Sequence, residues 1–306
     1  MIALSESRTS QGPAAVLRSH WPEYLIEAAG LGTFMVSAGI FATLLFAPVS
    51  PLASWQRDPL FTRLLMGVAM GLTAIAIVYS PWGMRSGAHL NPALTLTFWR
   101  LGKVRSHDAA FYIIAQFAGG LAGVLVVAAV LGNPFRSAPV HYVATLPGPQ
   151  GNAAAWFAEV GIAFVLMSAI LFFTNRASIH RYAGIVGGTL VAAYIALESP
   201  ISGMSLNPAR TLASALPAAE LSTLWIYFTA PPLGMLLAAA LYTNRYGRHH
   251  VKCAKMYHDN DQPCIFECGY RGTETAGTGL VPGAGSRGTT NEKDITPLEG
   301  RLGRSE

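Results

Sequence analysis

The chain has 306 residues, of which 52% are hydrophobic and only 12% are charged, and its formal net charge is +5. Soluble domains seldom combine so much apolar content with so little charge, so the composition argues against a soluble fold and favours a membrane protein. The positive charge requires no nucleic-acid partner, because Lys and Arg on cytoplasmic loops, next to the acidic headgroups of the lipid bilayer, account for it.

Six apolar stretches are long enough to cross a bilayer. A hydrocarbon core about 30 Å thick needs roughly 20 apolar residues per helix. Such stretches lie near residues 24–47, 63–80, 108–131, 154–174, 182–199 and 222–243. Most Lys and Arg residues between them fall on one side of the membrane, which the positive-inside rule makes the cytoplasmic side. We therefore expect an all-α, multi-pass protein of the inner membrane with six transmembrane helices and both termini in the cytoplasm.

Composition divides the chain into four parts. Residues 1–22 are polar and lack the continuous apolar run of a secretory signal, whereas residues 23–245 hold all six apolar stretches. Residues 246–268 contain all three cysteines, and residues 269–306 are rich in Gly and Thr and poor in apolar side chains. We expect a cytoplasmic N-terminal segment, one membrane domain, a Cys/His-containing cytoplasmic segment and a disordered tail.

An internal repeat is the strongest feature of the sequence. The segments SGAHLNPALTL at 86–96 and SGMSLNPARTL at 202–212 agree at 8 of 11 positions and begin 116 residues apart. Three of the expected helices lie between them, and an odd number of crossings places the two copies on opposite sides of the membrane. The repeat is therefore inverted.

Each copy has the pattern of a helix start. Asn91 and Asn207 stand at the cap position, and Pro92 and Pro208 stand at the first helical position. The apolar runs that follow are too short to span a bilayer, and non-helical backbone at membrane depth is tolerated only where it is buried in protein or lines a water-filled cavity. We expect two re-entrant half-helices that enter from opposite faces and meet with their N-termini at a pore.

These paired Asn-Pro-Ala boxes resemble those of the aquaporin and glycerol-facilitator family, also called the major intrinsic proteins, over about residues 22–245. The boxes consist of Asn91, Pro92, Ala93, Asn207, Pro208 and Ala209. The resemblance implies a homotetramer with one pore per protomer and a passive channel for water or small uncharged solutes that excludes ions and protons. It also implies that the protein is not an enzyme and needs no cofactor for transport.

The resemblance also implies roles for residues around the boxes. Backbone carbonyls that line the path would belong to Ala88, His89, Gly203, Met204 and Ser205. We expect the His89 side chain to anchor its loop and not to transfer protons. Glu27 and Glu159 match the family's buried carboxylate in each repeat, so we expect them to accept hydrogen bonds from the loop amides. Proton transfer is the alternative role for such intramembrane carboxylates.

A selectivity filter is expected around Arg210, which follows the second box as the family's filter arginine does. By similarity, Met70, Ile195 and Met204 complete the constriction. Water-selective members usually carry aromatic and polar groups at these places, so we expect an unusually apolar wall opposite Arg210. The stretch between Met70 and the first box is one residue longer than is usual, which leaves Gly71 as the alternative to Met70.

Two other functions remain open at this point. One is a secondary transporter built on the same inverted repeat, although an ion-coupled transporter should carry ion-binding groups at its helix breaks, where this chain has Asn91 and Asn207. The other is a channel for glycerol or other neutral solutes with little water flux. A passive channel is the function that the sequence favours.

The segment after the last apolar stretch contains a candidate metal site. Its four candidate ligands, of the types that zinc prefers, are Cys253, His258, Cys264 and Cys268. A reducing cytoplasm disfavours a structural disulfide there. Zinc binding is the hypothesis, and redox-sensitive or incidental cysteines are the alternatives.

Overall fold

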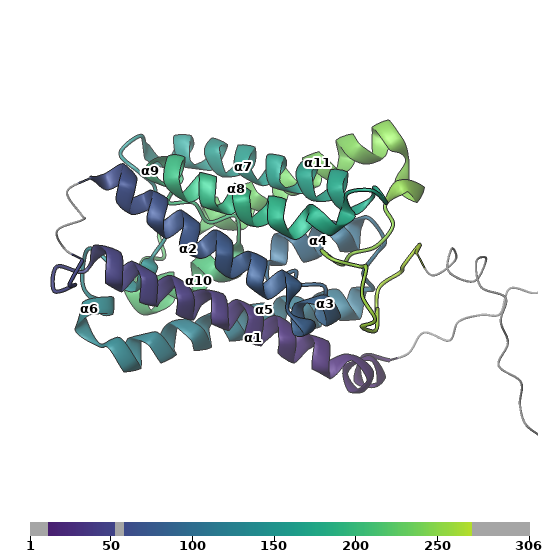
Figure 1. Cartoon of the computed structure of the whole chain (residues 1–306), viewed down its shortest axis with the longest axis horizontal. Helices are drawn as coiled ribbons and strands as arrows, with labels where there is room; N and C mark the ends of the chain where they lie inside the picture. Colours follow the sequence, from purple (N-terminus) through teal and green to yellow (C-terminus); the bar gives the residue numbers. More distant parts are fainter. Residues whose placement is uncertain (1–11, 53–57, 271–306) are drawn as a thin grey trace, which may run out of the picture. The chain divides into compact units, whose positions relative to one another are not determined.

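The structure, a computed structural model, describes residues 12–52 and 58–270, and in these ranges its regular elements are all helices (Figure 1). The tail expected to be disordered therefore falls, after Tyr270, outside the described residues. The all-α fold predicted from the sequence is confirmed.

A helix is present at each of the six expected places. Five of these helices are apolar and long enough to cross a bilayer: α1 (Pro13–Phe46), α2 (Pro59–Tyr79), α5 (Ser106–Leu131), α7 (Gly151–Thr174) and α11 (Leu224–Tyr246). The sixth, α8 (Ala183–Leu197), has only 15 residues. A 3₁₀ turn (His180–Tyr182) precedes it and the short helix α9 (Ser199–Ser202) follows it, so part of the expected 182–199 span is not in one continuous helix.

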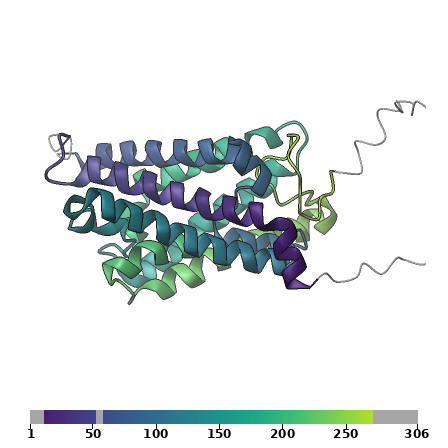
Figure 2. The same ribbon diagram turned by 90° about the horizontal axis from the view of Figure 1, so that it is seen from below.

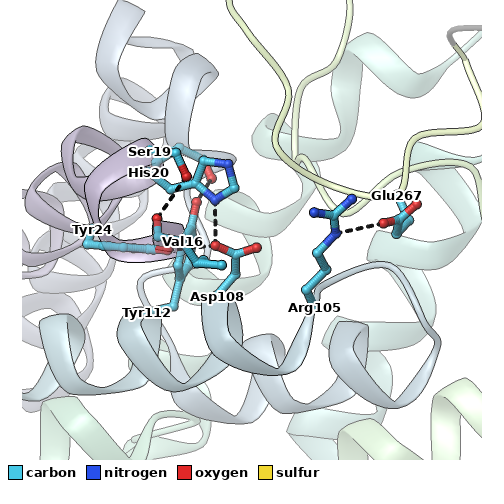
Figure 3. Close-up of polar contacts among 9 residues, drawn as sticks. Val16, Ser19, His20, Tyr24, Arg105, Asp108, Tyr112 and Glu267 are labelled. Carbon is cyan, nitrogen blue, oxygen red and sulfur yellow. Dashed lines mark hydrogen bonds and ion pairs between the residues drawn. The ribbon is translucent and has the colours of Figure 1, made fainter. Parts of the chain in front are cut away.

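The first helix starts earlier than the sequence predicts. The helix α1 begins at Pro13 and contains Pro22, so residues 13–22 are not a separate segment but the first turns of α1. Figure 3 shows what holds them: Asp108 at the start of α5 accepts a hydrogen bond from the Tyr24 hydroxyl at 2.6 Å and contacts the His20 ring at 2.7 Å. This buried anchor on a neighbouring helix keeps the turn around Pro22 in place.

The two half-helices are present where the repeat predicts them. They are α4 (Pro92–Arg100) and α10 (Pro208–Ala218), each preceded by a short helix, α3 (Pro81–Ser86) and α9 respectively. The remaining short elements are α6 (Asn133–Arg136) and 3₁₀ turns at His141–Val143 and Arg248–His250. The element order α1 to α5 is thus repeated, α6 aside, by α7 to α11.

Packing follows the same repeat. The helix α1 packs against α5, and α7 packs against α11 in the equivalent way, while α2 packs against α8 of the other repeat. Figure 2 shows α1 lying between α2 and α5. The paired helices approach very closely: a Cβ on Gly119 of α5 would lie 2.0 Å from the Ala28 carbonyl oxygen of α1. Only glycine allows that contact without moving a helix.

The outer surface of the helices carries large apolar side chains. Ile114, Val130, Phe157 and Leu241 are each at least 59% exposed. Such a surface would be unfavourable in water but suits lipid, which makes the bundle a multi-pass membrane structure.

Candidate pore and selectivity filter

The asparagines of both boxes cap the half-helices that they begin. The side-chain oxygen of Asn91 accepts a hydrogen bond from the Ala93 amide at 2.9 Å, and that of Asn207 accepts one from the Ala209 amide at 3.0 Å. These contacts also determine the orientation of each carboxamide, because the atom facing a backbone N–H must be the oxygen. The carboxamide nitrogens therefore point the other way.

Those nitrogens link the two repeats. The Nδ2 atom of Asn91 donates to the Leu206 carbonyl at 2.8 Å, and that of Asn207 donates to the Leu90 carbonyl at 2.7 Å. The two half-helices thus meet N-terminus to N-terminus. Each Nδ2 carries two hydrogens and uses one in this contact, so the second has no partner among the described residues and is available to a molecule in the cavity that both asparagines line.

The loops before the boxes hold a backbone conformation that ordinary residues disfavour. Positive φ angles between 51° and 59° occur at equivalent places in both repeats, namely Ala88, Leu90, Met204 and Leu206. A left-handed residue other than glycine costs about 1–2 kcal/mol. Four of them persist only where surrounding contacts impose them.

The carboxylate of Glu27 supplies those contacts in the first repeat. It accepts hydrogen bonds from the backbone amides of His89 at 3.0 Å and Leu90 at 2.6 Å, and from the Ser86 hydroxyl at 2.8 Å. Gln116 of α5 donates a fourth, at 2.8 Å. The side chain is fully buried, and its hydrogen bonds are all spent on the loop and on α5.

In the second repeat Glu159 does the same. It accepts from the amides of Ser205 at 2.6 Å and Leu206 at 2.8 Å and from the Ser202 hydroxyl at 3.0 Å. Each carboxylate therefore accepts from two consecutive amides of a segment with left-handed backbone.

Sequence reasoning missed a second pair of supports. The hydroxyl of Tyr112 donates to the Ser86 carbonyl at 2.7 Å, and that of Tyr227 donates to the Ser202 carbonyl at 2.6 Å. A signal for them existed, because the two tyrosines stand 115 residues apart, close to the spacing of the boxes.

One cavity of about 290 Å³ joins the boxes to the expected filter. Of the residues predicted for the pore, those that line it are Met70, Ala88, His89, Asn91, Ile195, Gly203, Met204, Ser205, Asn207 and Arg210. Gly71, the alternative to Met70, does not line the cavity. It packs instead against α8, where a Cβ would lie 2.6 Å from the Gly188 carbonyl oxygen.

The guanidinium of Arg210 has a buried nitrogen, Nη1, without a hydrogen-bond partner among the described residues. Leaving such a donor unsatisfied is costly, so a molecule passing through the cavity would gain by bonding to it. A second arginine on the wall was missed by sequence reasoning: Arg63 of α2, whose Nε donates to the Ala196 carbonyl at 3.1 Å.

Comparisons with known proteins agree with this geometry. A family model described as "Major intrinsic protein" matches residues 19–242. The chain belongs to this family. Among its relatives, Aquaporin NIP1-4 of Oryza sativa subsp. japonica is 34% identical over 212 residues, which is 68% of this chain and 76% of that protein. Aquaporin NIP3-1 of the same organism is 32% identical over 67% of this chain and 65% of its own length.

A solved structure shares the fold. The aquaglyceroporin from Plasmodium falciparum superposes with a TM-score of 0.58 at 20% identity, over 73% of this chain and 95% of that one. The match to one further curated relative spans only 60% of its length. Proteins of the major intrinsic protein family are channels and not enzymes.

In this major intrinsic protein the side chain of His89 contacts two different regions. Its Nδ1 lies 3.1 Å from the Thr95 hydroxyl of α4, a contact that Ser205 repeats with Thr211 in the other half. Its Nε2 lies 2.9 Å from the carbonyl oxygen of Ala254, which is in the Cys/His segment. The ring is therefore fixed on both sides.

The four candidate metal ligands come together. One ligand atom from each of Cys253, His258, Cys264 and Cys268 lies within 4.8 Å of all the others, and none of the three cysteines forms a disulfide within the described residues. Hydrogen bonding with Cys253 lowers the pKa of the Cys264 thiol and also that of the Cys268 thiol. The same contacts, with Cys264 first and Cys268 second, raise the pKa of the Cys253 thiol. A cluster of this composition and spacing can hold a metal ion.

Proposed function

We propose that this chain is a passive channel for water and small uncharged solutes. The observation that supports it most is the single cavity that contains both box asparagines and an unpaired Arg210 nitrogen. A neutral molecule with lone pairs can accept hydrogen bonds from all three groups along one path. No energy source is needed for such movement.

Ion and proton exclusion follows from the same groups. Each half-helix N-terminus carries roughly half a positive charge, and the two meet near Asn91 and Asn207. Arg210 adds a full charge at the filter. A cation would meet positive potential at two successive places, and a water held by both asparagines donates its hydrogens outward, which interrupts a proton wire.

The cavity disfavours a secondary transporter. None of the described residues that line it is Asp or Glu. The two buried carboxylates that contact the re-entrant loops, Glu27 and Glu159, use their oxygens to accept from loop amides, hydroxyls and Gln116, which leaves them poorly placed to bind a coupling ion. Coupling to a proton or sodium gradient would require such a group on the path.

We propose that the filter limits solutes by their size and by the cost of losing hydration, and not by hydrogen bonding to its wall. Met70, Ile195 and Met204 bring thioether and aliphatic surface to the cavity that contains Arg210. A water molecule loses hydrogen bonds against this wall, whereas a solute with carbon surface loses fewer. Small neutral solutes such as glycerol or urea should therefore pass well relative to water.

Stopped-flow light scattering on proteoliposomes tests the proposal. We expect flux of water, glycerol and urea that rises linearly with the concentration gradient and does not depend on a proton or sodium gradient. Saturable uphill uptake driven by either gradient would contradict it, and so would conductance of cations.

A homotetramer in the inner membrane with both termini in the cytoplasm is part of the proposal, carried over from the family resemblance and the Lys and Arg distribution. Mass photometry of the protein in nanodiscs tests the assembly, since four chains per particle are expected. Protease added to intact cells tests the orientation, because a cytoplasmic C-terminal tag should stay uncleaved.

Zn²⁺ is the ion we propose for the Cys/His cluster. Zn–S bonds of about 2.3 Å place neighbouring sulfurs of a tetrahedral site about 3.8 Å apart. The Cys253 and Cys264 sulfurs are 3.5 Å apart, and the Cys268 sulfur is 2.9 Å from His258 Nε2, so small movements complete the geometry. None of the four ligands lines the cavity itself.

A further inference from the structure

The Cys/His cluster belongs to a segment that lies against the mouth of the pore. Residues 251–270, here named the cap segment, have no helix or strand but form part of the same buried core as the first half-helix. Figure 1 shows the segment, in yellow, beside α3 at one end of the bundle. It is packed into the channel domain and does not hang free of it.

Backbone contacts attach the cap segment to the first re-entrant loop. The Met256 amide donates to the Gly87 carbonyl at 3.1 Å, and the Ala254 carbonyl lies 2.9 Å from His89 Nε2. The Phe266 ring stacks on the His89 ring with centroids 5.3 Å apart and planes at 7°. The loop that carries the first box is therefore directly in contact with the segment.

Further contacts attach it to the rest of that face. The Lys252 amide donates to the Asn175 side chain at 2.7 Å, and the Glu267 amide donates to the Lys103 carbonyl at 3.0 Å. Figure 3 shows Arg105 reaching Glu267, with 2.9 Å between Nε and Oε1. Both repeats thus take part in holding the segment.

One side chain of the cap segment enters the pore. Met256 lines the same cavity as Ala88, His89 and the boxes. It is 6% exposed, and Phe266, which stacks on His89, is 5% exposed. A flexible thioether at the end of the cavity narrows the path and can move aside without breaking a helix.

The candidate ligands bracket both of these residues in sequence. Cys253 and His258 stand on either side of Met256, and Cys264 and Cys268 stand on either side of Phe266. A segment of about 20 residues without helix or strand has too little core to hold its shape alone, and metal ligation is a usual way to supply the missing stability. The positions of Met256 and Phe266 should depend on the ligated cluster.

We propose that Zn²⁺, bound by Cys253, His258, Cys264 and Cys268, holds the cap segment as a plug that restricts the cytoplasmic mouth of the pore. The proposal rests on the channel function proposed above. Loss of the ion releases Met256 and Phe266 from the mouth and raises flux. Zinc supply would then regulate the channel.

The test uses the full-length protein in proteoliposomes, with bound zinc measured by mass spectrometry and glycerol flux by light scattering. We expect one Zn²⁺ per chain, and a severalfold rise in flux when a membrane-permeable chelator removes it. Co²⁺ in place of Zn²⁺ should give thiolate charge-transfer absorption, a readout independent of flux.

Three variants separate the steps. Met256→Ala should raise flux severalfold while keeping one Zn²⁺, and Cys264→Ser should lose the ion and no longer respond to the chelator. His250→Ala, an exposed histidine outside the cluster, is the matched control and should behave as the parent protein. If Cys264→Ser does not fold, chelation and Met256→Ala still decide the question.

The outcomes distinguish the possible failures. A parent protein that conducts glycerol but binds no zinc would overturn the metal site. Bound zinc, with flux that neither the chelator nor Met256→Ala changes, would overturn the plug and leave the channel intact. Absence of flux in every variant, Met256→Ala included, would instead reject the channel function on which the plug depends.

Discussion

Replacing Glu159 tests the support of the second re-entrant loop. Its Oε1 accepts from the Ser202 hydroxyl and the Ser205 amide, and its Oε2 accepts from the Leu206 amide alone. In Glu159→Gln the amide oxygen can take the place of Oε1, so only the Leu206 amide loses its acceptor. In Glu159→Leu both backbone amides and the hydroxyl lose theirs.

The difference should be measurable. An unsatisfied buried amide costs about 1–3 kcal/mol, so the two amides cost about 2–6 kcal/mol in the leucine variant against about 1–3 kcal/mol in the glutamine variant. The strained left-handed backbone at Met204 and Leu206 is then free to relax, which should distort the loop before the second box.

Thermal unfolding in detergent, followed by tryptophan fluorescence, and glycerol flux in proteoliposomes are the measurements. We expect unfolding temperature and flux to fall in the order parent, glutamine, leucine. Glu220→Leu removes a carboxylate that is partly exposed and controls for the loss of a charge as such. Equal unfolding temperatures and equal flux for the two Glu159 variants would refute the support role and favour proton transfer.

Three further variants probe other parts of the site. Arg210→Ala should raise cation or proton conductance more than it changes neutral flux, because a fixed charge at a constriction acts mainly on charged species; electrophysiology on planar bilayers is the check. Ile195→His should raise the ratio of water flux to glycerol flux, since it narrows the passage and adds a polar group beside Arg210; a constant ratio would place the filter elsewhere. His89→Ser copies Ser205 of the other repeat, so it should keep the loop anchored to Thr95 but lose the cap segment; faster proteolysis within residues 251–270 with an intact channel domain is expected, and unchanged proteolysis would contradict it.

The inverted repeat made much of the pore predictable. Asn91 and Asn207 share a local sequence, and that sequence predicts a capped helix start without any structure. The left-handed backbone at Ala88 and Met204 was not predictable, because nothing in those side chains favours it. It is imposed by carboxylates on helices that are distant in sequence, and such long-range support has no local pattern.

The ends of the membrane domain were harder to predict. Pro22 predicts a helix boundary, because a proline inside a helix removes a backbone hydrogen bond. The structure carries α1 through it, with Tyr24 and His20 held by Asp108 of α5. That tertiary contact overrides the local preference, and the apolar pattern that locates a transmembrane span gives no information about it.

The cap segment shows the same limit more sharply. The sequence predicted its candidate ligands, because three Cys and one His stand at short spacing. Met256 and Phe266 belong to no periodic pattern, so the sequence did not single them out. Their burial depends on surfaces that appear only once the channel domain has folded. The packing of the cap segment against the channel domain could therefore not be predicted from the sequence.

The most informative positions are those where the repeat is broken. Arg210 stands where the first repeat has Leu94, and His89 stands where the second has Ser205. The residues that hold the loops are the same in both repeats, because both loops have left-handed residues at equivalent places. The proposed filter and the proposed cap each need only one half of the repeat, so their residues can differ between the halves. Both Arg210 and His89 line the cavity. Arg210 has a buried donor without a partner among the described residues and lines the cavity, whereas His89 turns its second nitrogen to Ala254, so the proposed filter and the proposed plug each depend on a residue that only one half of the repeat has.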